Sequence, residues 1–336
     1  MRVLFVTPAE PAGPHLPFVR REAHALRNAG HPAEMFAFDD SRCSPGYFIA
    51  RAAELRAAVR RFRPDVVHAQ LGRMNALAAA CGATGLAPLV VTFRGADIDR
   101  HTRYSAARSA LGVLASQLAA FLASGIVCAS REIRGRVLAR RWRPTLVLPS
   151  GVDLKSFVPG ERAAARARLG FGADERIVLF ASGRNPAVTD PELAGQAVDD
   201  ARRRIGPLRL AVLDGSLPPE ELPHYMNAAD CLLLTSKTGG SPAAVQEAMA
   251  CNLPVVSVDV GDVRERLEGV GECAVVERCP IALGMAMADI LRAPRRSDGR
   301  KHAAELGVDA LASRLAAFYA EVLTHGSDAH TTRAGV

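Results

Sequence analysis

Short β-rich apolar runs alternate with helical segments along nearly the whole chain of 336 residues, and this alternation restricts the possible folds more than any other feature. In the first half, we expect strands at residues 2–7, 33–38, 66–69, 89–93, 125–129 and 145–148. The segments between them are rich in Ala, Leu and Arg, and their apolar residues recur with the period of an α-helix. Alternating strands and helices predict a parallel sheet that helices cover on both faces.

The pattern is interrupted by Pro-Ser-Gly-Val-Asp at 149–153, and a second series of strands and helices follows. Its strands are expected at 177–181, 208–213, 231–234, 255–258 and 273–276. Two such series predict an α/β protein with two Rossmann-like, doubly wound domains that face a central cleft at the carboxyl ends of their strands. We expect an N-terminal domain at 1–150, a second domain at 151–308, a C-terminal helix at 309–325 and a disordered tail at 326–336.

Composition argues against several classes of protein. No apolar run reaches the ~18 residues that a membrane-spanning helix needs, and the apolar N-terminal run is too short for a signal peptide. The seven cysteines are scattered and form no Cys-x-x-Cys pair, which is typical of free thiols in a reducing compartment. We therefore expect a cytoplasmic protein. Aromatic residues make up only 5% of the chain and no nucleic-acid-binding motif is present, so we expect no nucleic-acid partner.

The formal net charge of +7 is carried mostly by arginine, and two groups of arginines mark candidate basic faces. These groups are Arg20, Arg21 and Arg27, and then Arg51, Arg56, Arg60, Arg61 and Arg63. One interpretation is that these are solvated helix faces. The other hypothesis is peripheral contact with an anionic membrane at its inner surface.

The most informative segment is residues 232–256, in which a buried strand runs into a glycine-containing loop and then into a helix at 242–251. Ser241 is expected as the N-cap and Pro242 as the first helical residue. The free N–H groups and the positive dipole end of such a helix suit an anion such as a diphosphate. Glu247 lies further along the helix, where its carboxylate can accept two hydrogen bonds from a ribose diol. The candidate diphosphate ligands are Gly239, Gly240, Ser241 and Ala243.

This segment resembles the donor-binding signature of retaining family-4 glycosyltransferases, which reads Glu-x7-Glu followed by Ala-Met-Ala-x-x-x-Pro-Val-Val. In that family the second glutamate holds the ribose of the nucleotide, and it corresponds to Glu247. The first glutamate faces the donor sugar and the diphosphate, and Gly239 takes its place here. No acidic residue lies between Asp230 and Glu247, so the motif is degenerate in this chain.

Similarity to the same family spans roughly residues 1–325. The segments that contain His68 and Asp97 resemble strand ends facing the family's cleft, and 148–157 resembles its interdomain linker. Many members have a histidine at the position of Arg94, and some members that assemble polysaccharides have an arginine there, as this chain does. The group that the chain resembles is that of polysaccharide and teichuronic acid biosynthesis.

The resemblance implies a GT-B fold and an activity. The expected reaction moves a sugar from a nucleotide-diphosphate donor, with UDP or GDP as the nucleotide, to a glycan, lipid-linked or small-molecule acceptor, natural products included. Retention of configuration is implied, as is the absence of a metal or any other cofactor.

The chain departs from the family pattern at a second place. After the first strand of the second domain, family members carry an arginine and a lysine that bind the diphosphate. In this chain Arg184 matches the arginine, whereas the lysine expected near Thr189 is missing. Lys237 or Arg94 can compensate for this loss. With Gly239, the departure leaves several alternatives open: an altered donor, a phosphoribosyl-type transferase or nucleotide-sugar epimerase on the same fold, or a non-catalytic degenerate transferase.

On the acceptor side, we predict Arg94, Asp97 and His68 as catalytic residues, although a lone histidine at the end of a buried strand is more often structural. Asp97 and Asp99 have the Asp-x-Asp spacing of metal-dependent transferases, but they follow a glycine at a strand end. We interpret Asp97 as a structural or acceptor-side carboxylate and predict no metal site. Gly13, in the loop after the first strand, is expected either to contact the donor phosphate through its N–H or to form a simple turn.

Overall fold

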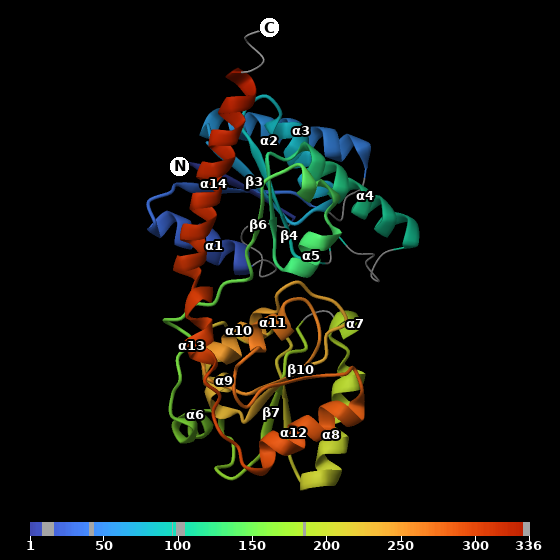
Figure 1. Cartoon of the computed structure of the whole chain (residues 1–336), viewed down its shortest axis with the longest axis vertical. Helices are drawn as coiled ribbons and strands as arrows, with labels where there is room; N and C mark the ends of the chain where they lie inside the picture. The colour runs from blue at the N-terminus through green and yellow to red at the C-terminus, as the bar shows by residue number, and fades with distance from the viewer. Residues whose placement is uncertain (9–16, 40–43, 96, 99–104, 184–185, 332–336) are drawn as a thin grey trace. The chain divides into compact units, whose positions relative to one another are not determined.

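The computed structural model of the chain consists of two compact units, Met1–Pro149 together with Val308–Val336, and Ser150–Gly307 (Figure 1). The structure describes residues 1–8, 17–39, 44–95, 97–98, 105–183 and 186–331. Within these residues, no helix combines the length and the apolar character needed to cross a membrane.

The first unit is built on a six-stranded parallel sheet with the strand order β2-β1-β3-β4-β5-β6. The strands are β1 Val3–Thr7, β2 Ala33–Ala37, β3 Val66–Gln70, β4 Leu89–Phe93, β5 Gly125–Cys128 and β6 Thr145–Val147. The helices are α1 Pro17–Asn28, α2 Pro45–Phe62, α3 Arg73–Ala83, α4 Ala106–Leu122, α5 Arg131–Arg136, the 3-10 turn η1 Leu138–Arg141, and α14 Val308–Thr331.

Strand β1 shows how this sheet divides two layers of core. Successive side chains of a strand point to opposite faces. Leu4 and Val6 belong to the core that includes residues of α2, α3 and α4, and Val3 and Phe5 belong to the core that includes residues of α1 and α14. All residues of β1, β3, β4 and β5 are buried, as expected for parallel strands with helices on both faces.

Helix α14 returns the chain to the first unit and lies beside α1 (Figure 1). Leu315, Tyr319 and Val322 are buried against the sheet, and Arg314 donates a hydrogen bond to the carbonyl of Val147. The helix continues to Thr331, into residues for which disorder was expected. Its packed turns supply a nucleus, and each further turn then costs little to add.

The second unit contains a five-stranded parallel sheet with the order β11-β10-β9-β7-β8. Its strands are β7 Ile177–Phe180, β8 Arg209–Val212, β9 Cys231–Leu234, β10 Val255–Val258 and β11 Ala274–Val276. The helices are α6 Arg162–Leu169, α7 Pro186–Thr189, α8 Pro191–Ile205, α9 Leu222–Ala228, α10 Ala243–Ala250, α11 Val263–Leu267, α12 Pro280–Arg292, α13 Gly299–Ala303 and the 3-10 turn η2 Ala304–Leu306. The strand order reverses between β7 and β9, which is the switch point where such sheets bind ligands. The predicted pair of doubly wound parallel sheets is confirmed.

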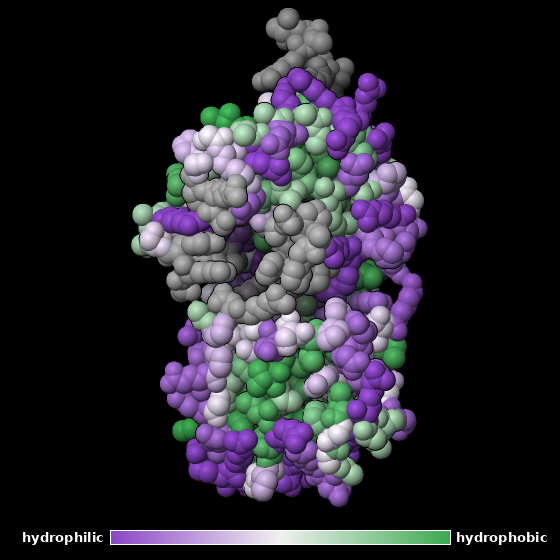
Figure 2. Space-filling model, turned by 180° about the vertical axis from the view of Figure 1, so that it is seen from behind, coloured by the Kyte–Doolittle hydropathy of each residue, from purple (hydrophilic) through white to green (hydrophobic). Residues whose placement is uncertain are grey.

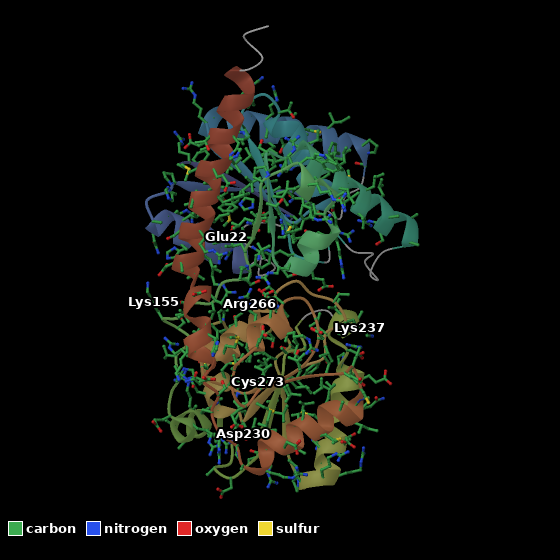
Figure 3. The ribbon with its side chains drawn as sticks, in the orientation of Figure 1. Glu22, Lys155, Asp230, Lys237, Arg266 and Cys273 are labelled. Carbon is green, nitrogen blue, oxygen red and sulfur yellow. The ribbon has the colours of Figure 1, made fainter. Side chains whose placement is uncertain are left out.

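A buried ion pair fixes the amino end of the second sheet. Asp230 immediately precedes β9 and accepts two hydrogen bonds from the guanidinium of Arg166, at 2.9 and 3.1 Å, and one from the N–H of Ile177 at 2.8 Å. Figure 3 shows Asp230 at one end of this unit and Lys237 and Arg266 at the other. In the view of Figure 2, hydrophobic residues reach the surface in the middle of the second unit, and hydrophilic residues surround them.

Candidate functional site

The switch point of the second sheet places the loop 235–242 between β9 and α10. Helix α10 has Pro242 as its N-cap, and no side chain caps its first N–H groups. The expectation that Ser241 caps the helix and that Pro242 is its first residue is therefore wrong. The hydroxyl of Ser241 instead donates to Oδ2 of Asp262 at 2.8 Å and accepts from Nε2 of Gln246 at 2.6 Å. This arrangement leaves the helix N-terminus, with partly exposed Ala243, uncapped by side chains and suited to an anion.

The loop at 239–241 is held in place by the segment that follows β10. Gly261 has a φ of +60°, and a Cβ atom added there would lie 2.4 Å from the carbonyl oxygen of Gly240. The N–H of Asp262 donates to the same oxygen at 3.0 Å. Because nothing larger than glycine fits this approach, the two loops form one rigid support. Ser150 adds a hydrogen bond from its hydroxyl to the carbonyl of Ser241 at 2.9 Å.

Asp262 is the centre of this support and was missed in the sequence. It is 3% exposed and also accepts from Nε of Arg266 at 2.9 Å. Burial raises the pKa of its carboxyl group, and the hydrogen bonds from Arg266 and Ser241 oppose that rise. The available signal was the Gly-Asp pair at 261–262, separated by two residues from the strand predicted at 255–258.

Glu247 lies in the buried second turn of α10, with 8% of its surface exposed. Its neighbour Gln246 has a buried side-chain oxygen, Oε1, without a hydrogen-bond partner among the described residues. Such an atom costs free energy unless water or a ligand donates to it. Helix α10 therefore carries two acceptor groups close to its uncapped end.

Gly239 occupies the position where the family motif has its first glutamate. A Cβ atom built there would lie 3.8 Å from Cγ2 of Val260 and 3.9 Å from Cγ of Pro242, which are ordinary contacts. Steric exclusion therefore does not explain the glycine, because a side chain has room to begin at this position. The departure removes a carboxylate from a position that has room for a side chain.

Lys237 lies beside the turn where the family lysine is missing. Its N–H donates to the carbonyl of Val188 at 2.8 Å, and the hydroxyl of Thr235 donates to the carbonyl of Thr189 at 2.6 Å. The ammonium of Lys237 lies 3.3 Å from Oδ2 of Asp190. The end of β9 is thus joined to α7, and a cation is present next to Thr189. Arg184 and Gly13 lie outside the described residues.

Arg278, which follows β11, was not identified from the sequence. It pairs with Asp190 and donates to the carbonyl of Thr235 at 2.7 Å. Burial opposes ionisation of Asp190, but the hydrogen bonds from Lys237 and Arg278 prevail and lower its pKa. Two cations share one carboxylate, so this corner of the sheet keeps a positive charge.

A pocket of about 550 Å³ opens at the carboxyl ends of β9, β10 and β11. Lys237, Arg264 and Arg278 contribute cations to its wall, and Asp259 and Glu277 contribute carboxylates. Arg264 is bound to Asp259 at 2.7 Å. The pocket therefore adjoins the Lys237 corner and suits a polar, charged ligand.

In the first unit, Arg94 follows β4 and is part of a buried network rather than a free cation. Its guanidinium donates to Oε2 of Glu22 at 3.0 Å and to Oε1 of Gln70 at 3.2 Å, and it stacks 4.3 Å above the ring of Phe18. Burial lowers the pKa of Arg94 and raises that of Glu22, and their mutual attraction opposes both shifts. The arginine is thus fixed in orientation at the carboxyl end of the sheet.

Glu22 was missed, although the sequence carried a signal. It lies on α1 between Val19 and Leu26, at a spacing that places it on the apolar face of the helix. An acidic residue in such a stripe needs a buried partner, and Arg94 is that partner. Figure 3 shows Glu22 on α1 in the first unit.

His68 lies in the interior of the first unit and has no exposed surface. One ring nitrogen bonds the hydroxyl of Tyr319 and the other that of Thr92, both at 2.6 Å. Burial, reinforced by the charge of Arg94, lowers its pKa to about 3, so the ring is neutral. With both nitrogens occupied by the protein, the geometry favours the structural role for this residue over proton transfer to a substrate.

Asp97 also serves the backbone. Its carboxylate accepts from the N–H groups of Gly72, Arg94 and Gly95 at 2.8 to 3.3 Å, and the residue is 2% exposed. Burial raises its pKa, and these three bonds oppose the rise. Asp97 therefore positions the strand end that carries Arg94, in line with its interpretation as a structural carboxylate. Asp99 lies outside the described residues.

Two family models match the chain. Residues 17–156 match the model described as Glycosyltransferase Family 4, and residues 175–293 match that of Glycosyl transferases group 1. Among curated proteins, the chain is similar to the putative teichuronic acid biosynthesis glycosyltransferase TuaC of Bacillus subtilis, with 26% identity over 64% of this chain and 58% of that protein. It is 28% identical to a D-inositol 3-phosphate glycosyltransferase of Thermobispora bispora over 60% of this chain and 56% of that protein. The chain thus matches less than two thirds of the length of these relatives.

Solved structures share the fold over nearly the full length of the chain. Sucrose-phosphate synthase from Thermosynechococcus elongatus has a TM-score of 0.79 at 19% identity, covering 96% of this chain and 99% of that one. HepE of Anabaena in complex with UDP-glucose has a TM-score of 0.66 at 18% identity, covering 98% of this chain and 100% of that one. The two parallel sheets and these solved structures identify the fold as GT-B, and the chain contains one segment that matches the Glycosyltransferase Family 4 model and one that matches the Glycosyl transferases group 1 model.

Proposed function

We propose that the chain transfers a sugar from a nucleoside-diphosphate donor, and that the second unit holds the nucleotide. The observation that carries this proposal is the rigid loop 239–241, which precedes the uncapped N-terminus of α10 at the switch point of the sheet. An anion at such a helix end meets free N–H groups and the positive end of the helix dipole.

Each part of the site has a role in this proposal. The N–H groups of Gly240, Ser241 and Ala243 bind the diphosphate, and Glu247 accepts hydrogen bonds from the ribose hydroxyls. Lys237 supplies the cation that the family lysine otherwise provides, with Arg184 as the second. A charged hydrogen bond contributes about 1.5–3 kcal/mol, so Lys237 can account for roughly tenfold to hundredfold in affinity.

The chemical step needs a departing diphosphate to be stabilised. The proposed mechanism uses the helix dipole, backbone N–H groups and cationic side chains for this purpose, without a metal ion. Arg94, held by Glu22 and Gln70, presents a fixed cation at the end of the first sheet on the acceptor side. Retention of configuration is part of the proposal by resemblance to the family.

The relatives support a proposal for the donor and acceptor classes. We propose UDP or GDP as the nucleotide by resemblance to the family, and the UDP-glucose complex of a solved protein with this fold supports UDP. For the acceptor we propose a growing glycan or a lipid-linked glycan, supported by the likeness to a teichuronic acid biosynthesis protein. The phosphoribosyl-transferase and epimerase alternatives share the anion site and the ribose clamp, and the ligand panel below separates the first of them.

Isothermal titration calorimetry with UDP, GDP, ADP, CMP and phosphoribosyl pyrophosphate tests the donor site. We expect micromolar binding of UDP or GDP, weakened at least tenfold by Glu247→Gln because a neutral amide loses the charged hydrogen bonds to ribose. Glu268→Gln, an exposed glutamate of the same unit, is the matched control and leaves binding unchanged. Tightest binding of phosphoribosyl pyrophosphate would favour the phosphoribosyl alternative, and binding of none of the five would contradict the assigned site.

Turnover is measured separately, by release of UDP or GDP from a panel of the matching nucleotide sugars with and without a chelator. Chelator-insensitive release, and an unchanged anomeric configuration in the product by NMR, are the expected results. If the nucleotide binds but none of the sugars turns over, the chain is a non-catalytic transferase, and Gly239→Glu with Thr189→Lys would then be expected to raise activity.

A further inference from the structure

The solvent face of α4 is apolar, in contrast to most surface helices. Leu111, Leu114, Leu118, Phe121 and Leu122 lie along one side of the helix and are 40–64% exposed. Every exposed position of this helix after residue 109 is apolar.

The inner face of α4 is correspondingly more polar than its outer face. Ser109 and Ser116 are buried, with 1% and 0% exposure, and the other buried positions are glycine and alanine. An ordinary amphipathic helix turns its leucines inward, because burial of an apolar side chain is favourable. The inverted pattern means that the leucines gain little from folding of this unit alone, which points to a partner outside it.

Two further apolar residues extend the stripe. Leu138 and Trp142 are 55% and 66% exposed, and the ring of Trp142 packs against that of Phe121 with 5.7 Å between centroids. Gln117 fixes this segment to α4, since it donates to the carbonyl of Arg136 and accepts from the N–H of Leu138. We call this surface the α4 patch; it comprises Leu111, Leu114, Leu118, Phe121, Leu122, Leu138 and Trp142.

Cations border the α4 patch. Residues 131–143 contain six arginines and one glutamate, a formal net charge of +5. Arg134 and Arg141 are exposed, and Arg143 donates to the carbonyl of Phe121 at the edge of the patch. Proteins bind anionic lipid surfaces with three features: leucines that enter the boundary between headgroups and acyl chains, a tryptophan at the membrane–water interface, and arginines that reach lipid phosphates.

We propose that the α4 patch docks the first unit onto an anionic lipid bilayer. The leucines and Trp142 enter the region between headgroups and acyl chains, and the arginines of 131–143 contact lipid phosphates. This docking is independent of sugar transfer, so its test reads lipid binding alone.

The main competing occupant is a second copy of the chain. A symmetric contact through the patch would bring two segments of charge +5 to the same interface, where like charges repel. An anionic bilayer instead neutralises this charge while it covers the leucines. Charge complementarity therefore favours the lipid surface.

Trp142 provides a direct readout because it is the single tryptophan of the chain. The full chain is mixed with phosphatidylcholine vesicles that do or do not contain phosphatidylglycerol. With the anionic vesicles we expect Trp142 emission to shift to shorter wavelengths, to be quenched by lipids brominated on their acyl chains, and to recover at high salt. No association, or association without a change in Trp142 emission, would overturn the proposal.

Matched variants locate the contact. Leu114→Asp with Leu118→Asp is expected to lower the vesicle partition coefficient at least tenfold. The control pair, Ile281→Asp with Met285→Asp on α12, has the same spacing and similar exposure, 56% and 47%, and is expected to bind like the unaltered chain. All four side chains are exposed, and circular dichroism verifies that each variant is folded.

A second pair of variants tests the charges. Arg134→Glu with Arg141→Glu should weaken binding more than tenfold, since each cation near an anionic surface contributes about fivefold. Arg60→Glu with Arg61→Glu on α2 makes the same change in charge away from the patch and should have a smaller effect. Equal losses from both arginine pairs would overturn the assignment to this surface, as would a concentration-dependent dimer that Leu114→Asp with Leu118→Asp dissociates.

Discussion

Replacing Gly261 by alanine is expected to disable the donor loop while leaving the unit folded. The new Cβ would lie 2.4 Å from the carbonyl oxygen of Gly240 and 2.7 Å from that of Gly239. An ordinary contact is 3.4 Å or more, so the loop has to retreat by about 1 Å. The φ of +60° adds strain of about 1–2 kcal/mol for a residue with a side chain.

The retreat moves the backbone that is proposed to hold the diphosphate. Displacements of about 1 Å in a binding or catalytic geometry cost up to a hundredfold. We therefore expect Gly261→Ala to weaken binding of the preferred nucleoside diphosphate by about tenfold to a hundredfold, and to lower the free energy of unfolding by about 1–3 kcal/mol. Calorimetric titration measures the first effect and urea denaturation the second.

Gly239→Ala is the matched control for this experiment. Its Cβ meets Val260 at 3.8 Å and Pro242 at 3.9 Å, so the same added methyl group makes only ordinary contacts. The nucleotide affinity of this variant is expected to stay within about twofold of the unaltered chain. If Gly261→Ala binds nucleotide as tightly as Gly239→Ala, the loop at 259–262 does not support the donor site and the reasoning fails.

Three other measurements test separate parts of the structure. Asp230→Ala leaves the guanidinium of Arg166 buried without its carboxylate and should lower the free energy of unfolding by about 3–5 kcal/mol. The control Asp199→Ala, at a side chain that is 61% exposed, should change it by less than about 0.5 kcal/mol. Urea denaturation of both variants measures the difference. His68 has a pKa of about 3 in the folded chain, against an ordinary value of 6.5 for an exposed histidine. The unfolded chain therefore binds the extra proton first, and stability falls as the pH drops through this window. The loss is about 2 kcal/mol between pH 7 and pH 5, and a His68→Gln variant with the same pH dependence as the unaltered chain would refute this. Lys237→Ala should weaken nucleoside-diphosphate binding about tenfold or more in the calorimeter, and an unchanged affinity would show that its ammonium does not reach the phosphates.

Much of the fold was predictable because the signals are local. Strands β4, β9 and β10 have the expected bounds, since each apolar run is delimited by proline or charged residues. The short helices α7 and α11 were not expected. At four and five residues they are too short to show a helical period in the sequence.

The site was predictable in part for a related reason. The helix with Glu247 follows from its motif, but the role of Ser241 does not, because its partner Asp262 lies on another loop. The contacts of His68 with Tyr319 and of Arg94 with Glu22 join residues far apart in the chain. No local pattern encodes such pairs, although a glutamate within an apolar helical stripe shows that a buried partner must exist.

The return of α14 to the first unit has a consequence for synthesis on the ribosome. The second unit, Ser150–Gly307, is continuous in sequence and has all its strands once residue 307 has emerged. The first unit emerges earlier, but α1 alone covers only part of one face of its sheet, and the His68 ring lacks the Tyr319 hydroxyl, until Val308–Thr331 follows. The unit that is translated first is therefore the one that completes its core last, and during that interval the apolar face that will receive Leu315 and Val322 is open to chaperones and to aggregation.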